Sequence, residues 1–365
     1  MAKYKRRPKV KRYHRSFYSR GTRIKRGAGI VVLVLAVLGA AWLAAPHVLD
    51  WATHTWYTVV RNRDLEAESA SRAASEAAAS SAAVTAASSQ AASEPKPQFD
   101  ARSAAAGTWA ELDPASLTDD ASIRAAARQL KAQNASYALI PLKEVDGTIR
   151  YASKVSAASG SIAQDTVDPA RIAAILREEE IIPAAKLAAF KDPVTPRTDR
   201  SMGIHYEGTM LWMDAVENGK PWLNPYSDAA VQYLGDLVEE LQSMGFEQVV
   251  LTNVQFPRFS RKQDYGETGG LSRADRLRAD IDALQTRFDG SVTVWFSYPL
   301  DQCENTSDVL DAAALTLGVR ELLVTAAGDA DAEALSALET AAREAGVRSL
   351  ALQSAEGTRT VYVSG

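Results

Sequence analysis

The sequence predicts an α/β protein whose main domain, residues 107–365, is a (β/α)8 TIM barrel. Short apolar runs alternate there with amphipathic stretches, and this alternation implies parallel strands joined by helices. About eight runs occur within a length close to the roughly 250 residues of a closed barrel. An open doubly wound sheet is the alternative. No Gly-rich phosphate loop supports it.

The apolar runs read as strands covered on both faces. They occupy residues 107–109, 138–140, 181–190, 249–254, 292–296, 322–324, 350–352 and 361–363. Between them, apolar residues recur every three or four positions, for example at 231–241 and 277–288. Asp168-Pro169 and Ser272 are expected to begin helices, and Gly245 and Gly346 to follow helix ends. These signals divide the segment into strand and helix units.

The N-terminal 106 residues differ in composition from the barrel segment. Residues 1–26 hold twelve Lys or Arg and no acidic residue, and are expected to form a basic cytoplasmic tail that could also contact anionic lipid head groups. Residues 27–49 contain no Asp, Glu, Lys or Arg and are long enough for a transmembrane signal anchor. A cleaved signal peptide is the alternative. The C-terminal domain is then expected outside the cell membrane.

Residues 50–106 are expected to be a spacer, because 21 of the 30 residues between Leu65 and Glu94 are Ala or Ser. Such a segment forms a helical stalk or is disordered. Cys303 is the only cysteine, so an intramolecular disulfide is excluded. It lies in a polar segment that we interpret as a loop.

Common catalytic signatures are absent from the sequence. HExxH, CxxC, GxSxG and GxxxxGKS do not occur, and His205 is the only histidine of the barrel segment. Zinc chemistry and a Ser-His-Asp hydrolase are therefore not expected, and neither is a cofactor, a metal or a nucleic-acid partner.

Candidate ligand-binding residues come from the carboxyl ends of the predicted strands, where a barrel holds its site. Aromatic and amide side chains stack on sugar faces and bond their hydroxyl groups, so a glycan is the expected ligand. The candidates are Lys143, Lys186, Trp222, Asn224, Tyr226, Thr252, Asn253, Gln255 and Trp295. Structural interpretations are also open for Trp222, Asn224, Tyr226, Thr252 and Asn253. An ion pair is favoured for Lys186, because an unpaired buried ammonium is costly.

Several motifs together resemble a known family. GTIRYAS, AFKDP, the Trp-x-Asn-Pro-Tyr-Ser run at 222–227 and GFEQVVLTNVQFP are similar to the "putative glycoside hydrolase domain" family of bacterial envelope proteins, over roughly residues 107–300. The resemblance implies a barrel of the α-amylase type and a glycan substrate.

The fourth predicted strand departs from that family's pattern. Where the family typically has Phe-Asp-Tyr-Val-Arg-Phe-Pro, this chain has Thr252 in place of the presumed catalytic Asp, Asn253 in place of Tyr and Gln255 in place of Arg. The fifth strand has Trp295 where a second carboxylate would be expected. Glycoside hydrolysis ordinarily needs two carboxyl groups, and the remaining candidates for displaced ones are Asp192 and Glu144.

These observations lead to one expectation and two alternatives. We expect a membrane-anchored, extracytoplasmic domain that binds a cell-envelope or extracellular glycan with lost or much reduced hydrolysis. An active glycosidase that uses displaced carboxylates is the first alternative, so the sequence leaves enzymatic activity open. An envelope protein-protein scaffold is the second.

Overall fold

The computed structural model describes residues 107–328, 332–355 and 357–363. The predicted tail, signal anchor and spacer, residues 1–26, 27–49 and 50–106, lie outside this part of the chain. Among the described residues, no helix is both long and apolar enough to cross a membrane.

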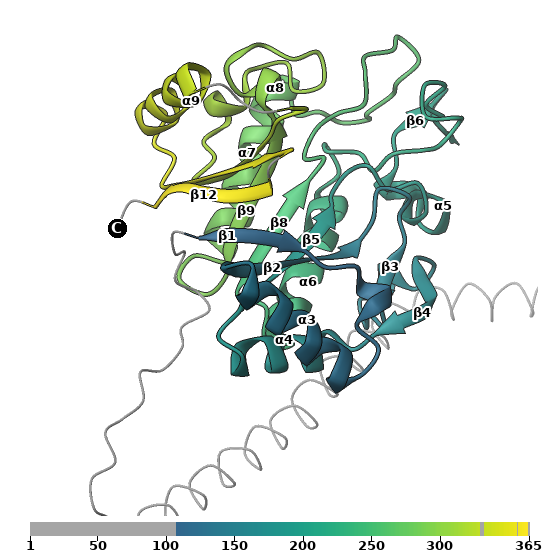
Figure 1. The fold of residues 1–365 in the computed structure, drawn as a ribbon. Coiled ribbons are helices and arrows are strands. Elements are labelled where there is room, and N and C mark those ends of the chain that lie inside the picture. Colours follow the sequence, from purple (N-terminus) through teal and green to yellow (C-terminus); the bar gives the residue numbers. More distant parts are fainter. Residues whose placement is uncertain (1–106, 329–331, 356, 364–365) are drawn as a thin grey trace, which may run out of the picture. The chain divides into compact units, whose positions relative to one another are not determined.

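Eight strands form a closed barrel (Figure 1). In barrel order they are β1 (Thr108–Glu111), β2 (Ala135–Lys143), β5 (Ile182–Ala188), β8 (Gln248–Thr252), β9 (Thr293–Pro299), β10 (Glu321–Thr325), β11 (Ser349–Ser354) and β12 (Gly357–Val363). Pairing of β1 with β2 closes the ring. All eight predicted strands therefore belong to the barrel.

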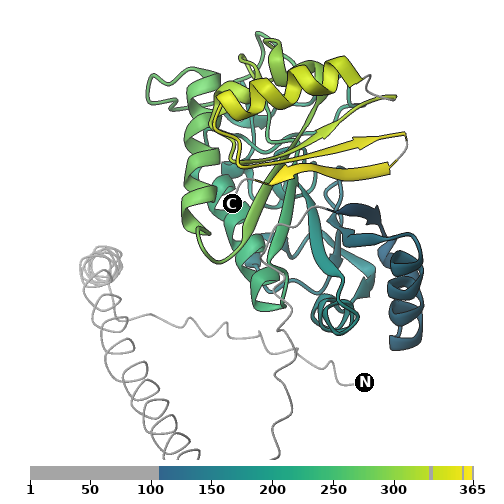
Figure 2. The same cartoon turned by 60° about the vertical axis from the view of Figure 1, so that its left-hand side comes forward.

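The last strand corrects the predicted topology. β12 runs antiparallel to both neighbours, β11 and β1, whereas a (β/α)8 barrel has eight parallel strands. Only two residues separate Ser354 from Gly357, too few for a parallel crossover, which needs a dozen or more. The chain therefore turns back as a hairpin, which Figure 2 shows in yellow.

Helices cover the outside of the barrel (Figures 1 and 2). They are α3 (Asp120–Ala132), α4 (Pro169–Glu178), α6 (Asp228–Ser243), α7 (Arg273–Arg287), α8 (Leu300–Glu304) and α9 (Ala332–Glu344). The predicted starts at Asp168 and Ser272 are confirmed, because each side chain accepts a backbone N–H of its helix. Ser227 holds the N-cap position of α6 without such a bond.

The loops at the carboxyl ends of the first strands contain further short elements. β3 (Ile149–Tyr151) and β4 (Ile162–Val167) follow β2, and α5 (Thr195–Thr198) with the hairpin β6 (His205–Tyr206) and β7 (Met210–Leu211) follows β5. Turns of 3-10 helix occupy Pro114–Ser116, Ser156–Ala158 and Arg200–Met202 in these loops, and a further one, Ala314–Leu317, precedes β10. These additions enlarge the side of the barrel that holds the candidate site.

Aromatic side chains fill the barrel interior. The Trp109 ring stacks on Tyr137 with 4.0 Å between ring centroids and meets the edge of Trp295 at 5.3 Å. The indole N–H of Trp295 donates to the side-chain oxygen of Gln248 at 2.7 Å. The interior is thus a packed core, which underlies the end of the barrel where the strands have their carboxyl ends.

Asp280 on α7 is a buried acid with incomplete hydrogen bonding. Its Oδ1 lies 2.9 Å from Nε of Arg276, while Oδ2 has no partner. Burial raises the pKa of this carboxyl to about 8, and the nearby Arg276 only partly offsets the effect. The folded protein therefore keeps a proton that the unfolded chain loses above about pH 4.

We expect Asp280→Asn to stabilise the protein increasingly as the pH rises. The raised pKa makes the free energy of unfolding of the wild type fall between about pH 4 and pH 8, by at most about 1.4 kcal/mol per pH unit, and the neutral amide removes this dependence. Urea unfolding at pH 5 and pH 8 measures the difference. An advantage of the variant that does not grow with pH would contradict the expectation.

Candidate functional site

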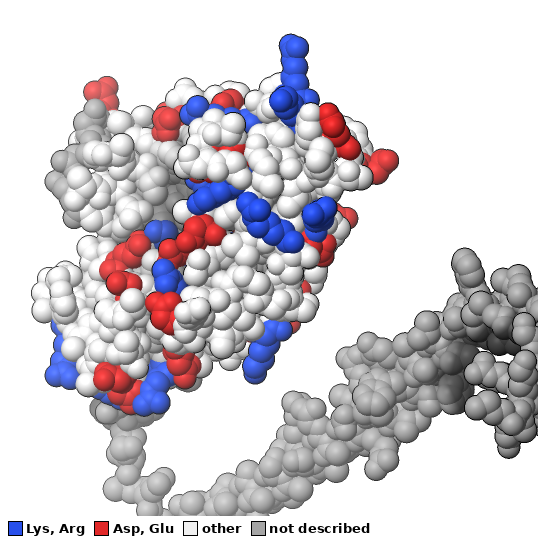
Figure 3. Space-filling view, turned by 90° about the vertical axis from the view of Figure 1, so that its right-hand side faces the viewer, with Lys and Arg blue, Asp and Glu red and all other residues white. Residues whose placement is uncertain are grey.

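A pocket of about 580 Å³ opens at the carboxyl ends of β1, β2, β5 and β8. Its lining consists of Glu111, Asp113, Pro114, Pro141, Lys143, Glu144, Val145, Lys186, Ala188 and Thr252. Figure 3 faces this side of the molecule and shows acidic and basic side chains next to one another beside a hollow. We call the pocket with this lining the mouth pocket.

Lys143, at the end of β2, forms a fully buried ion pair behind the pocket wall. Its Nζ lies 3.0 Å from Oδ2 of Asp192, and both side chains have 0% exposure. The ammonium also donates to the carbonyl of Ala188 at 2.7 Å. Oδ1 of Asp192 accepts the N–H groups of Val194 and Thr195. Asp192 is therefore saturated with protein partners, and the structure gives it a positioning role.

Glu111, at the end of β1, is a site residue that the sequence analysis missed. Its carboxylate lies 2.8 Å from Nζ of Lys186, which supplies the partner expected for that lysine. Glu111 stands two residues beyond Trp109, so strand alternation puts both on the inner side of the barrel. This period-two relation was the available signal, but the predicted strand ended at residue 109.

The other acidic residues of the pocket come from loops. Glu144 pairs with Arg150 at 2.6 Å and is about one-third exposed. Asp113 accepts the N–H of Ala115 and begins a turn of 3-10 helix. With Glu111, these carboxylates lie on the β1 and β2 side of the pocket.

The end of β8 contributes hydroxyl and amide groups. Thr252 lines the pocket and its hydroxyl lies 3.4 Å from the carbonyl of Leu187. Asn253 has a φ of 56°, in the left-handed region that Asn adopts more readily than most residues. Gln255 is half-buried in the following loop. Among the pocket-lining residues, the β8 end provides no carboxylate.

Trp222, Asn224 and Tyr226 lie in the loop layer and not in the pocket lining. Trp222 is buried with Ile204 and Trp212. Asn224 donates to the carbonyl of Tyr265 at 3.0 Å and accepts the N–H of Tyr226. The hydroxyl of Tyr226 donates to Leu271. These contacts hold the loops in place.

Two further residues are more buried than the sequence suggested. Trp295 has 0% exposure inside the barrel, because it lies two residues before the strand position that faces the mouth. Cys303 lies buried in α8, not in a polar loop, and burial raises the pKa of its thiol to about 12.

Of the candidates, the structure brings Lys143, Lys186, Thr252 and Glu144 together at the pocket. In the described part of the chain, no cluster of His, Cys, Asp or Glu is arranged to hold a metal ion.

We expect Asp192→Asn to destabilise the fold by about 3–5 kcal/mol, because it leaves the buried Lys143 ammonium without a counter-charge. Glu144→Gln is the matched control, since its part-exposed pair with Arg150 should contribute about 1 kcal/mol or less. Urea unfolding compares the two variants. Equal losses of stability would contradict the positioning role of Asp192.

Comparisons with known proteins agree with part of the sequence analysis. Residues 114–286, slightly less than half of the chain, match the family described as "Putative glycosyl hydrolase domain". No curated protein matches the chain. Similar solved structures include a hypothetical protein from Ruminiclostridium thermocellum, with 18% identity, a TM-score of 0.46 and coverage of 51% of this chain and 95% of the other.

Two enzymes of glycoside hydrolase family 20 are also similar in structure. The β-N-acetylhexosaminidase of Streptomyces coelicolor has 13% identity and a TM-score of 0.42, and 68% of this chain covers 48% of that one. The exo-β-N-acetylglucosaminidase of Vibrio harveyi, solved with N-acetylglucosamine, has 11% identity and a TM-score of 0.45, and 68% of this chain covers 41% of it. The chain spans less than half of these two enzymes. The family match supports a glycoside-hydrolase-like interpretation of the matched part of the domain, residues 114–286.

Proposed function

We propose that the mouth pocket binds a cell-envelope or extracellular glycan and that hydrolysis is lost or much reduced. The observation that carries this proposal is the distribution of charge in the pocket. Carboxylates lie on its β1 and β2 side, while Thr252 occupies the β8 side. The α-amylase type of barrel and the altered fourth strand are part of the same proposal.

Binding and hydrolysis make different demands on such a pocket. Hydroxyl, carboxylate and ammonium groups at the rim can all bond sugar hydroxyl groups. Hydrolysis ordinarily needs two carboxyl groups on opposite sides of the scissile bond, roughly 5–10 Å apart. Glu111 is held in an ion pair with Lys186, and Thr252 cannot supply the opposing negative charge. The pocket therefore favours binding.

Attachment to a membrane is also proposed. Its support is the apolar segment 27–49 and the twelve basic residues before it, which together favour an extracytoplasmic barrel. In this arrangement the Ala/Ser-rich spacer would separate the pocket from the lipid surface, where envelope glycans are available.

We expect Lys186→Met to weaken glycan binding about tenfold or more, since it removes a charged hydrogen-bond donor from the pocket and frees Glu111. Lys191→Met is the matched control, because Lys191 is similarly exposed and paired, with Glu217, outside the pocket lining. Binding to isolated envelope polysaccharide measures the effect. Absence of binding by the wild type, or equal losses in both variants, would argue against the proposed site.

The alternative function, hydrolysis by displaced carboxylates, is favoured by one observation. Glu111 and Glu144 line the same pocket, whereas Asp192 is buried and fully bonded. Asp113 also lines the pocket, but its Oδ1 accepts the N–H of Ala115. A working pair would therefore consist of Glu111 and Glu144.

We expect the wild type to release no more reducing ends from envelope polysaccharide than the double variant that carries Glu111→Gln and Glu144→Gln. A catalytic carboxylate commonly contributes several kcal/mol to transition-state stabilisation, so its removal from an active enzyme lowers the rate by about a hundredfold or more. A reducing-end assay with both single variants reads this directly. Release that disappears in either variant would establish hydrolysis and replace the proposed binding function.

A further inference from the structure

A short turn after β8 carries an unusual concentration of basic and aromatic side chains. Within residues 258–262 it holds Arg258, Phe259, Arg261 and Lys262, and we call residues 258–263 the basic turn. Phe259 is 68% exposed, although burying a side chain of its size would be favourable. The fold thus leaves an aromatic ring in solvent between cationic groups.

Hydrogen bonds within the basic turn fix its backbone. The side chain of Gln263 donates to the carbonyl of Arg258 at 2.8 Å and accepts the N–H of Ser260 at 3.0 Å. The neighbouring Asp264 exchanges two backbone hydrogen bonds with His205 of β6, at 2.8 and 2.9 Å. The turn is therefore ordered before any ligand arrives, which lowers the entropy cost of binding.

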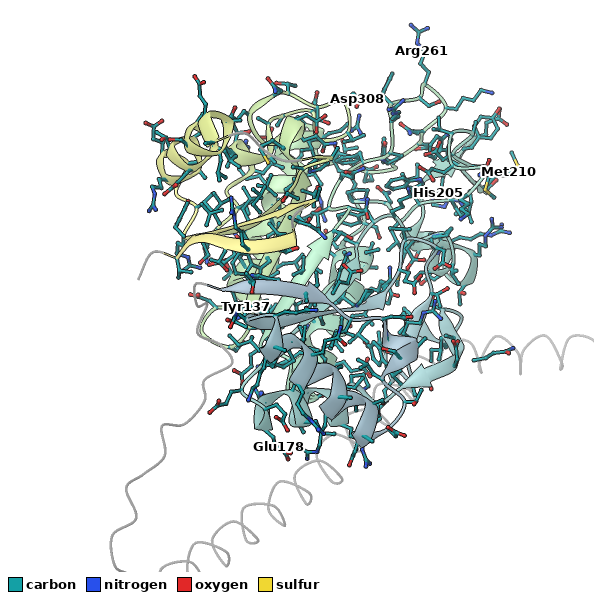
Figure 4. The ribbon with its side chains drawn as sticks, in the orientation of Figure 1. Tyr137, Glu178, His205, Met210, Arg261 and Asp308 are labelled. Carbon is teal, nitrogen blue, oxygen red and sulfur yellow. The ribbon has the colours of Figure 1, made fainter. Side chains whose placement is uncertain are left out.

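The charges of the basic turn are free of carboxylate partners. Among the described residues, no Asp or Glu lies within ion-pair distance of Arg258, Arg261 or Lys262, although pairs are formed by Lys143, Lys186, Lys191 and most arginines. Lys262 instead lies over the Tyr206 ring, 5.9 Å from its centroid. Figure 4 shows Arg261 pointing away from the domain. Three cations are thus available to an external anion.

The basic turn lies on the mouth side of the barrel, because it follows β8, whose last residue, Thr252, lines the mouth pocket. Residues 107–365 contain 24 basic and 38 acidic residues. An anionic polymer is therefore repelled by the domain as a whole, and attraction must come from a local group of cations.

We infer that the glycan bound by this protein is anionic, and that the basic turn binds its carboxylate or phosphate groups while Phe259 stacks on a sugar face. This inference rests on the proposed function, since it names the class of glycan. Arginine forks suit both anions, and an exposed aromatic ring suits the apolar face of a pyranose. A lipid surface or a nucleic acid would use the charges without needing a neighbouring sugar pocket.

Amide hydrogen exchange on the full chain tests this inference, because it reads binding locally and keeps the turn apart from the basic tail. The probes are polygalacturonate and its fully methyl-esterified form, which share one backbone and differ in charge. We expect polygalacturonate to slow exchange in peptides covering 253–272 by about tenfold at a concentration ten times its Kd, and the ester to slow it far less.

A charge-reversed pair of variants provides the control. Arg258→Glu combined with Arg261→Glu should abolish the protection of 253–272. Arg128→Glu combined with Arg359→Glu makes the same change of charge at exposed arginines that form no ion pair with another described residue, and should preserve it. Equal protection by the ester, no protection of the turn, or equal protection by phosphatidylglycerol vesicles or single-stranded DNA would overturn the inference.

Peptides at the mouth separate this inference from the proposed function. Protection of residues 184–190 without protection of 253–272 would preserve the proposed pocket and reject the anionic glycan. Protection of neither segment by polygalacturonate, together with no binding to isolated envelope polysaccharide, would reject both. Protection of the turn alone would show anion binding that does not use the mouth pocket, and would reject the inference as stated.

Discussion

The buried ion pair between Lys143 and Asp192 is the constraint on which the mouth of the barrel depends. It joins the end of β2 to the loop after β5, and its bonds to Ala188, Val194 and Thr195 fix the path of that loop. The pair is tightly packed. A Cβ atom added at Gly147 would lie 2.7 Å from Oδ1 of Asp192. A buried charge without its partner is costly, so these segments have to keep their positions together.

The two lysines of the pocket differ in their access to a ligand, because only Lys143 is fully buried. The charge of Lys143 is neutralised by Asp192 inside the protein, whereas Lys186 pairs with Glu111 at the open rim of the pocket. A rim pair is only part-buried, so a ligand hydroxyl or anion can compete for it at modest cost. The same pairing occupies the only strand-end carboxylate among the pocket-lining residues. Both effects favour ligand exchange at the rim over acid-base chemistry.

Sequence patterns predicted the existence of the strands better than their directions and depths. Apolar runs located all eight barrel strands, and Asp168 and Ser272 marked helix starts, because these signals are local. Periodicity carries no direction. The available sign of the antiparallel β12 was the short connection between the predicted strands at 350–352 and 361–363, which is too short for a parallel crossover. Depth is set by register between strands, which explains why Trp295 was placed at the mouth. Glu111 was missed because the predicted first strand ended at residue 109.

The polar end of β8 suits its own backbone, which limits what a single substitution there can achieve. Asn253 adopts a φ of 56°, where a bulky aromatic residue would be strained. Thr252 lies beside the carbonyl of Leu187 and the side chain of Asn253, so a carboxylate in its place would meet those acceptors before any substrate. The side chains at this strand end and its backbone conformation therefore depend on each other, and a single substitution at Thr252 would act within both constraints.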